Sequence, residues 1–345
     1  MTLLASRIQN IRSESRLDKW ELRASRYGAL DFFLADTKNS MGIITPELEQ
    51  KAFSSIGSTL EVPVLDFDGS ITISNSRSAT ISDDANTSAM QSVSFTTYSW
   101  GFTMVPSAYH NNEISFQRDF SRKFLKFLYE FASTLDTACI TALNTGKTQV
   151  FTDALVYTNV SDVLTATDAQ ESRIMADVGP MMEANDYFGG LHLIGNTGFQ
   201  SLSAREKEHA KYNDEQREIQ WLNKTLHFSN RVTNAVGNAA TFYAVNAGSV
   251  GLLFRVEREA LARRTSLTGH QWDIENLPLL NIPIGTYTYD SVGDQNAQFG
   301  AATVDNTRAM EKHYGFSVDV AVVTPYASDL TTIAAPIMAV AIQTP

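Results

Sequence analysis

The amino-acid sequence predicts an α+β protein. Three observations support this fold class: a very long amphipathic helix over residues 112–145, a long extended ribbon over residues 59–110, and shorter helices and strands that interleave along the rest of the chain. The sequence shows no internal repeat and no low-complexity linker. It also shows no clear domain boundary.

The long helix is the element on which we expect the rest of the chain to pack. Its apolar residues recur at spacings of three and four and therefore form one stripe: Phe116, Phe120, Phe124, Phe127, Phe131, Leu135, Cys139 and Ala142. Asn112 can cap the first turn, and Gly146 stops the helix. A helix of this length measures ~50 Å. Five aromatic rings need a broad apolar partner surface, and a core helix of a large α/β domain would show the same stripe.

The composition indicates a folded chain that is not a dedicated nucleic-acid binder. Of the 345 residues, 43% are hydrophobic and 19% are charged, and the formal net charge is -11. Proteins dedicated to nucleic acids need an excess of Lys and Arg to displace counterions from phosphates. The low charged fraction leaves much of the surface to Ser, Thr, Asn and Gln, which favours flat contacts between proteins.

We expect a soluble protein that stays in a reducing cytoplasm. The single cysteine, Cys139, allows no internal disulfide and lies on the apolar stripe, where an inert thiol is expected. The first residues show no secretory signal. The longest apolar run, residues 333–342, has about half the length that a membrane span requires.

Residues 1–44 are predicted to form an arm. The first 26 residues hold six basic and three acidic side chains, a net charge of +3, which leaves 21 basic and 35 acidic side chains, or -14, for the remainder. This asymmetry fits a strap on an acidic surface of the same or a neighbouring body, and a solvated helix fits it equally well. Thr45, Pro46 and Glu47 then begin a short helix that we expect to end at Gly57.

Residues 59–110 are predicted to form a long two-stranded ribbon. Ile71 and Ile73 alternate with polar residues before a polar tip at residues 76–91. After the tip the alternation resumes with aromatic and apolar side chains, namely Tyr98, Trp100, Phe102 and Met104. A two-stranded hairpin alone is marginally stable in water. We therefore expect a neighbouring subunit to cover it.

The rest of the chain gives shorter signals. Thr167 and Gln170 form a capping box for a helix to about Asn185, and the charged residues 201–220 predict a solvated helix or a surface loop. Strands are predicted over residues 150–157, 191–194, 225–232, 240–245, 285–290, 316–324 and 337–342, with an apolar turn at 249–253.

Two short motifs resemble ligand sites but fail on their spacing. Gly146, Lys147 and Thr148 match the end of a phosphate-binding loop, yet Thr141 stands where the first glycine belongs and a helix precedes the motif. We interpret it as a helix stop. The segment 66–69, Asp-Phe-Asp-Gly, begins like a calcium loop but lacks the third acidic ligand and the final glutamate, so a polar turn is the better interpretation.

No catalytic, cofactor-binding or metal residue is predicted. The sequence contains no HExxH, GxSxG or GxGxxG pattern. The six histidines are scattered and have no cysteine partners: His110, His192, His209, His227, His270 and His313. An enzyme could still assemble a site from distant residues, so an enzyme remains one of the alternatives.

The order of these parts resembles one known family. A basic N-terminal arm, a long β-ribbon, an unusually long helix and a return to terminal strands are similar to the major capsid protein of tailed bacteriophages, whose fold is named after phage Hong Kong ninety-seven. The resemblance covers nearly the whole chain. Three stretches carry it most clearly: LDTACITALNTGKTQV, GHQWDIENLPLLNIPIGTYTY and GFSVDVAVVTPYASDLTTIAAPIMAVAI.

The resemblance implies a division of the chain into four parts. Residues 1–58 would be the N-terminal arm, and residues 59–111 the extended loop, a β-ribbon that lies over an adjacent subunit. Residues 112–165 and 285–345 would form the peripheral domain, with the long helix as its spine. Residues 166–284 would form the axial domain, grouped around five-fold and six-fold axes.

The resemblance also implies a structural function. The subunit would assemble as hexamers and pentamers into the icosahedral head shell of a tailed phage and enclose double-stranded DNA non-specifically, without catalysis, cofactor or membrane. Its partners would be other copies of itself, a scaffold, a portal and, in some phages, decoration proteins. It would be assembled in the host bacterial cytoplasm and reside in the virion.

An encapsulin, a cellular compartment that encloses a cargo enzyme, is the alternative in the same fold, and a cytoplasmic enzyme with a dispersed site is less favoured. The long arm and ribbon favour the virus.

Covalent cross-linking between subunits is not expected. Some members of the family join a lysine of the extended loop to an asparagine of a neighbouring subunit. Residues 52–122 contain no lysine, and the guanidinium of Arg77 stays protonated and cannot act as the nucleophile. Cohesion should therefore be noncovalent, through burial of the aromatic face of the ribbon, strand pairing by the arm, and charge pairs between the basic arm and the acidic body.

Overall fold

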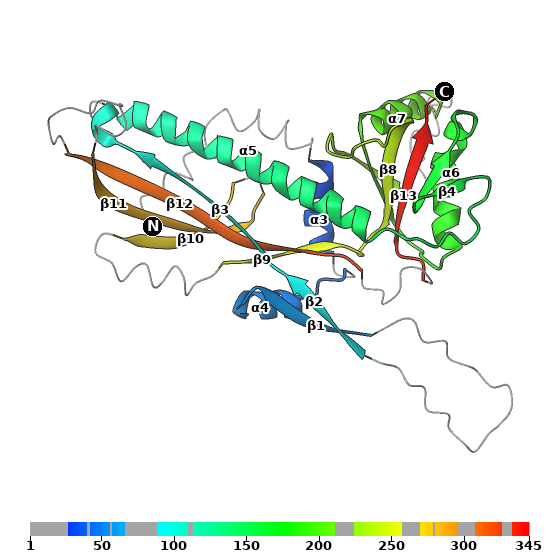
Figure 1. Cartoon of the computed structure of the whole chain (residues 1–345), viewed down its shortest axis with the longest axis horizontal. Coiled ribbons are helices and arrows are strands. Elements are labelled where there is room, and N and C mark those ends of the chain that lie inside the picture. Colours follow the sequence, from blue (N-terminus) through cyan, green and yellow to red (C-terminus); the bar gives the residue numbers. More distant parts are fainter. Residues whose placement is uncertain are drawn as a thin grey trace, which may run out of the picture.

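The computed structural model describes residues 27–39, 42–55, 57–65, 88–109, 113–210, 224–256, 270–278, 280–294, 308–325 and 333–344. Within these ranges helices and strands mix as expected, which confirms the α+β class. Figure 1 shows a long helix lying along one sheet, a second sheet with its own helices beyond the end of that helix, and a two-stranded ribbon beneath. Among the described helices, none combines the length and the hydropathy that a bilayer span needs.

The predicted long helix is confirmed as α5 (Glu113–Thr145). Every residue of the expected stripe is buried except Ala142, which is half-buried. The amide of Gly146 donates the last helical bond, to the carbonyl of Ala142 at 2.8 Å. The buried surface is wider than the stripe because the C-terminal half of α5 also contacts other elements through Leu128, Ala132, Ile140 and Leu143.

The broad partner of α5 is a five-stranded antiparallel sheet. Its strands are β3 (Thr96–Met104), β9 (Gly251–Arg255), β10 (Gln271–Asn276), β11 (Pro283–Asp294) and β12 (Arg308–Val323), in the order β10-β11-β12-β3, with β9 also paired to β12. Aromatic rings of β3 and β12 meet those of α5. Trp100 stacks on Phe127 with ring centroids 4.9 Å apart, and Phe316 meets Phe124 edge to face at 5.4 Å. Such pairs add to the free energy gained by burial alone.

The ribbon pairs differently from the prediction. Its strands are β1 (Thr59–Leu65) and β2 (Ser88–Ser94), which pair antiparallel, while residues 66–87, with Ile71 and Ile73, lie outside the described residues. The run from Tyr98 to Met104 was expected to be the second strand of the ribbon. Instead it is β3 and pairs with β12. The expectation that a neighbouring subunit covers this aromatic face was therefore wrong, because α5 of the same chain covers it.

A second, six-stranded sheet lies beyond the end of α5 (Figure 1). Its order is β4-β5-β13-β8-β6-β7, from β4 (Thr158–Val160), β5 (Val163–Ala166), β6 (Leu191–Gly195), β7 (Lys224–Phe228), β8 (Asn238–Asn246) and β13 (Ile337–Gln343). One face packs against α6 (Glu171–Glu183) and α7 (Thr197–Ala210). The other face contributes to the same core cluster as α3 (Gly28–Thr37) and α5.

The C-terminal strand does not stay with β11 and β12, although residues 285–345 were expected to return to the long helix as one part. β13 lies inside the six-stranded sheet, parallel to β5 and antiparallel to β8. Its side chains are buried on both faces: Ile337 and Ala339 join the core cluster of α5, and Met338 and Val340 join that of α6 and α7. A continuous apolar run is typical of a strand buried on both faces, so the run itself does not reveal which sheet receives it.

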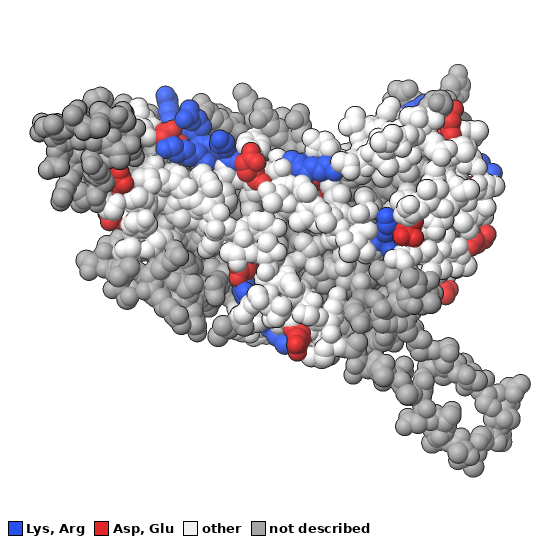
Figure 2. Space-filling view, in the orientation of Figure 1, with Lys and Arg blue, Asp and Glu red and all other residues white. Residues whose placement is uncertain are grey.

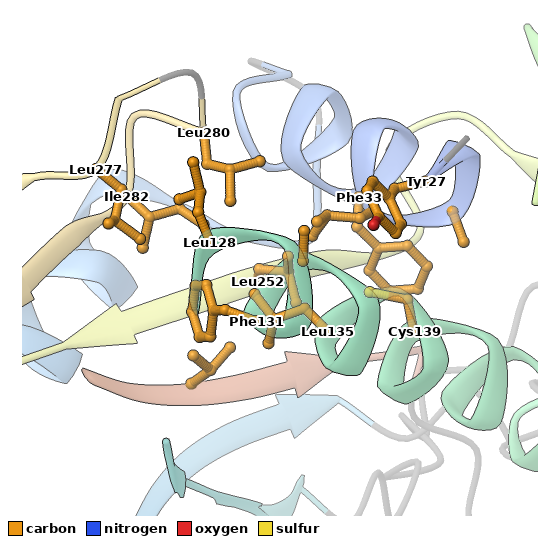
Figure 3. Close-up of a cluster of buried hydrophobic side chains, with 14 of the residues drawn as sticks. Tyr27, Phe33, Leu128, Phe131, Leu135, Cys139, Leu252, Leu277, Leu280 and Ile282 are labelled. Atoms are coloured by element: carbon orange, nitrogen blue, oxygen red, sulfur yellow. The ribbon is translucent and has the colours of Figure 1, made fainter. Parts of the chain in front are cut away.

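The end of the predicted arm belongs to the core. Residues 28–37 form α3, in which Ala29, Leu30, Phe32 and Phe33 are fully buried. A Cβ atom at Gly28 would lie 2.5 Å from the backbone of Phe228, so the close approach of α3 to the sheet requires glycine. Figure 3 shows how α3 and the loop from Leu277 to Ile282 close over α5. Residues 1–26, which hold the basic excess, lie outside the described residues.

The local helix signals were reliable. Thr45 caps α4 (Pro46–Ser54) by accepting a bond from the amide of Leu48 at 3.3 Å, as predicted, although α4 ends before Gly57. The capping box of Thr167 and Gln170 is present and begins a short 3-10 turn, η2 (Asp168–Gln170), that leads into α6. A second turn of this kind, η1 (Pro106–Tyr109), precedes α5.

Three other predictions need correction. Residues 150–157 form turns instead of a strand, and Asp153 and Leu155 have φ values of 54° that interrupt any extended run. The predicted apolar turn at 249–253 is a turn only at its start: from Gly251 the chain forms strand β9, which pairs with β12. Residues 201–220 were expected to form a solvated helix or a surface loop. Residues 201–210 belong to α7, which begins at Thr197 and buries Phe199 and Leu202 against the six-stranded sheet, and residues 211–220 lie outside the described residues.

Candidate assembly site at the root of the ribbon

The ribbon is fixed to the body by a small apolar cluster of its own chain. The cluster joins α4, β1, β2, β9, β12 and the loops beside them, through Ile44, Ala52, Leu60, Val93, Phe95, Leu253, Ala321 and Val323. A Cβ atom at Gly251 would lie 2.4 Å from Cδ1 of Ile44, so a larger residue there would force the Ile44 side chain to move. The amine of Lys51 donates to the carbonyl of Glu61 at 2.8 Å and ties α4 to β1. The end of the ribbon nearest the body is therefore held by contacts within the same chain.

A buried ion pair stands at the centre of this root. The guanidinium of Arg255 (β9) donates two hydrogen bonds to one carboxylate oxygen of Asp319 (β12), at 2.8 and 3.2 Å, and both residues are at most 5% exposed. The guanidinium also donates to the carbonyl and hydroxyl of Ser55, at 3.3 and 3.2 Å, and lies 4.3 Å from the ring centre of Phe95. Thr97 donates to the other oxygen of Asp319 at 2.7 Å.

These contacts connect elements that are far apart in the sequence. Ser55 follows α4, Phe95 separates β2 from β3, Thr97 lies in the first residues of β3, and the ion pair joins β9 to β12. Two desolvated charges are costly unless their bonds are satisfied, and here several neighbours satisfy them. Because Ser55 precedes β1 and Phe95 and Thr97 follow β2, the contacts of the ion pair fix the two chain segments that lead into and out of the ribbon.

A second set of buried carboxylates holds α3 between the two sheets. Asp136 of α5 accepts bonds from the amide of Leu30 at 2.9 Å and from the hydroxyl of Ser229 at 2.5 Å, and Arg231 lies 3.7 Å away. It caps the positive end of α3 in place of a residue of that helix. Burial raises the pKa of Asp136, and the bonds from Ser229 and Leu30 oppose this shift.

The far end of α3 and its exposed side also carry acids. Asp36 accepts bonds from the amides of Gly248 and Val250 at 2.6 and 3.1 Å, which fixes the helix to the turn before β9. Asp31 reaches solvent, but the protein packed around its carboxyl group and the nearby charge of Asp136 raise its pKa to about 6. The position of α3 is thus set by carboxylates as well as by its phenylalanines.

Two histidines that the sequence presents as scattered meet at the interface between α3 and the six-stranded sheet. Nδ1 of His192 (β6) lies 3.0 Å from Nε2 of His227 (β7), and Phe32 of α3 packs on both rings at 4.5 and 5.5 Å. Burial lowers the pKa of both histidines, to about 4 for His227. For His227 the neighbouring His192 adds to the effect, and for His192 the charge of Asp36 opposes it.

The motifs singled out in the sequence have structural roles or lie outside the described residues. The amine of Lys147 contacts the side-chain oxygen of Asn144 at 3.3 Å, and the buried hydroxyl of Thr148 donates to the carbonyl of Val150 at 2.8 Å. These bonds stabilise the chain reversal after α5, as expected of a helix stop. The segment 66–69 and His110 are not among the described residues. Where the structure describes side chains, no three His, Cys, Asp or Glu residues gather as metal ligands would.

Two surfaces on the body are suited to contacts with other proteins. Strand β4 is an edge of the six-stranded sheet, and apolar side chains near it are exposed: Leu155 at 47%, Val156 at 50% and Val160 at 54%. An open edge with exposed apolar residues favours pairing with another chain. The second surface is a groove of about 690 Å³ along the C-terminal half of α5, lined by Tyr98, Ser133, Thr134, Thr137, Ala138, Thr141, Ala142, Thr145 and Thr324.

Comparisons with known proteins give structural neighbours only. No protein-family model and no curated protein matches the sequence. Among solved structures, the capsid of Ralstonia phage GP4 is 11% identical with a TM-score of 0.47, and the match covers 86% of each chain. The capsid of Myoviridae phage XM1 is 11% identical with a TM-score of 0.43, covering 88% of this chain and 95% of the other. A structure of Mycobacterium phage Che8 is 12% identical with a TM-score of 0.44, covering 85% of this chain and 87% of the other.

The ion pair at the root predicts a non-additive pair of substitutions. Arg255→Met leaves the carboxylate of Asp319 buried without its cation and should cost about 3–5 kcal/mol of unfolding free energy. Arg255→Met combined with Asp319→Leu removes both charges and should recover most of that loss. Urea denaturation of the two variants and the parent measures this difference. A double variant no more stable than Arg255→Met would show that the charges do not depend on each other.

The histidine pair predicts a loss of stability in acid. The pKa of His227 is about 4 in the folded chain and 6.5 in an unfolded one. As the pH drops from 6.5 towards 4, the unfolded chain therefore binds a proton at His227 that the folded chain does not, and the free energy of unfolding falls. The full shift corresponds to about 3 kcal/mol. His227→Gln keeps a polar partner for His192 but does not titrate, so it should lose less stability than the parent between pH 7 and pH 4.5 in urea denaturation. Equal losses in the parent and the variant would contradict this assignment.

Proposed function

We propose that this chain is the major capsid protein of a tailed double-stranded DNA bacteriophage, a structural subunit without catalytic activity. Copies of it would assemble as hexamers and pentamers into the icosahedral head shell that encloses the genome. The observation that carries the proposal is the ribbon of β1 and β2. Its root is fixed by a buried ion pair, yet among the described strands β1 and β2 pair only with each other.

The ribbon supports a role in contacts between subunits because its strand edges leave backbone groups unpaired. Two strands alone are marginal in water, and each exposes an edge of unpaired backbone groups. Figure 1 shows them below both sheets, running diagonally away from α5. A rigid root with an extension that leaves its own body is suited to reaching the surface of an adjacent subunit. Met90 on β2, 58% exposed, is suited to such a contact.

The proposed parts of the subunit follow the two sheets. The peripheral domain would consist of α5 with the five-stranded sheet, and the axial domain of the six-stranded sheet with α6 and α7. The axial domain would then include β13, in contrast to the division implied by the sequence resemblance. Its open edge at β4 and the exposed Phe188 would face symmetry-related copies. Residues 1–26 would form the arm.

The remaining partners are proposed on the same basis. A scaffold, a portal and, in some phages, decoration proteins would accompany the shell, which would assemble in the host bacterial cytoplasm and remain in the virion. An encapsulin-type compartment that encloses a cargo enzyme is the alternative. The long ribbon favours the phage shell.

Electron microscopy of the purified full-length protein tests the proposal. Closed shells of uniform size are expected in negative stain, and nuclease-protected DNA inside particles from infected cells would identify a phage head. Shells that contain a protein cargo and no DNA would instead identify an encapsulin. A protein that stays monomeric under all assembly conditions would overturn both.

The lysine distribution predicts a shell without covalent links between subunits. Purified particles that are boiled in detergent without reductant should release the chain as a single band near its mass of 38.1 kDa. The reason is that residues 52–122 contain no lysine and that Cys139, the one cysteine, is fully buried. A ladder of oligomers on the gel would disprove the prediction, and mass spectrometry of its peptides would locate the linked residues.

A further inference from the structure

A row of cations lies on the outer side of α5. Arg118, Arg122 and Lys126 are exposed and follow each other at intervals of four residues, so their Cα atoms are separated by ~6 Å along the helix. Figure 2 shows these basic side chains gathered over the first half of α5. The opposite side of the helix is the phenylalanine stripe, which is packed on the sheet and fixes the row in place.

Acids of the same helix neutralise part of this charge: Asp119 lies within the row, and the exposed Glu130 follows Lys126 one turn later. Asp119 lies 3.4 Å from Arg122 and 3.2 Å from Lys123, and it accepts a bond from the hydroxyl of Tyr109 at 2.6 Å. Burial opposes ionisation of Asp119, but the bonds from Tyr109 and Lys123 lower its pKa, so it is charged. Arg118 and Lys126 form no ion pair with any described residue. From residue 118 to 126 the helix therefore carries four cations and one anion.

The row is unusual for a chain whose net charge is -11. It also lacks the features of a contact between proteins. The large apolar side chains that are exposed lie elsewhere in the described structure, at Met90, Leu155, Val156, Val160, Phe188, Val236 and Met310. The centres of protein interfaces are depleted of charge and enriched in aromatic residues, whereas phosphate contacts require cations and no apolar patch.

We propose that this side of α5 contacts the phosphates of double-stranded DNA, so that the long helix lines the inner surface of the shell. The inference rests on the proposed function and adds the identity of the surface that meets the genome. The contact would be electrostatic and independent of base sequence, because arginine and lysine on an exposed helix side reach phosphates without entering a groove. The alternative partner, an acidic surface of a neighbouring subunit, is an outcome of the test below.

The test compares two variants with the same change in net charge. In the first, Arg118→Gln, Arg122→Gln and Lys126→Gln remove the row. In the control, Lys147→Gln, Arg173→Gln and Arg205→Gln remove three cations beyond the N-terminal half of α5, of which Arg173 and Arg205 are paired with Asp177 and Glu171. Binding of the unassembled full-length proteins to a fluorescent 30-base-pair duplex is measured by anisotropy at several salt concentrations.

Loss of three phosphate contacts should reduce the slope of log affinity against log salt by about 2.7. The control should keep the slope of the parent. Equal slopes in all three proteins, or no binding by the parent at low salt, would overturn the proposal. So would a row variant that is folded by circular dichroism but forms no shells, because the row would then be an interface between copies. If the parent forms no shells at all, the proposed function fails, while the salt slopes still report on the row independently.

Discussion

The contact between the phenylalanine stripe of α5 and the aromatic strands β3 and β12 is the interaction on which the rest of the molecule depends. Rings from three elements stack and cross at centroid distances of 4.9 to 6.1 Å, so neither the helix nor the sheet can shift without separating several pairs. Because β3 follows the ribbon directly and β12 pairs with β9, the same contact also sets where the ribbon leaves the body. In an interior packed this closely, a shift of one element displaces the elements that it contacts.

The other end of α5 connects the two sheets through α3. Asp136 lies on the helix, caps α3 and binds Ser229, which follows the edge strand of the six-stranded sheet. The histidine pair, whose two rings are joined by a hydrogen bond, adds a ring contact with Phe32 of α3. The junction between the two parts of the protein is therefore built from directional bonds. Such a junction holds one relative orientation better than a purely apolar contact would, because each carboxylate has only a few positions in which its bonds are satisfied.

Local signals in the sequence predicted the helices well. The stripe of α5, the cap at Thr45 and the capping box at Thr167 depend on residues within one or two turns of each other, and all three were confirmed. Pairing between distant strands was less predictable. An alternating run such as Tyr98 to Met104 indicates a strand with one apolar face, but nothing in the run indicates whether its neighbour is β2 or β12.

The polar sites were missed for the same reason. Arg255 and Asp319 are 64 residues apart, and His192 and His227 are 35 apart, so their meeting is a result of strand order. A usable signal did exist for Asp136. It is a charged residue between Leu135 and Cys139 on an otherwise apolar helix side, and a carboxylate there needs buried donors.

The place of β13 in the six-stranded sheet has a consequence for the synthesis of the protein on the ribosome. β5 and β8 are separated in the finished sheet by a strand that the ribosome makes about a hundred residues after β8. Until residue 343 has emerged, both strands expose an unpaired edge, and the apolar faces of the sheet cannot close. A nascent chain therefore cannot present the finished six-stranded sheet to other chains. The late strand would delay any contact that needs the finished sheet until β13 has joined it.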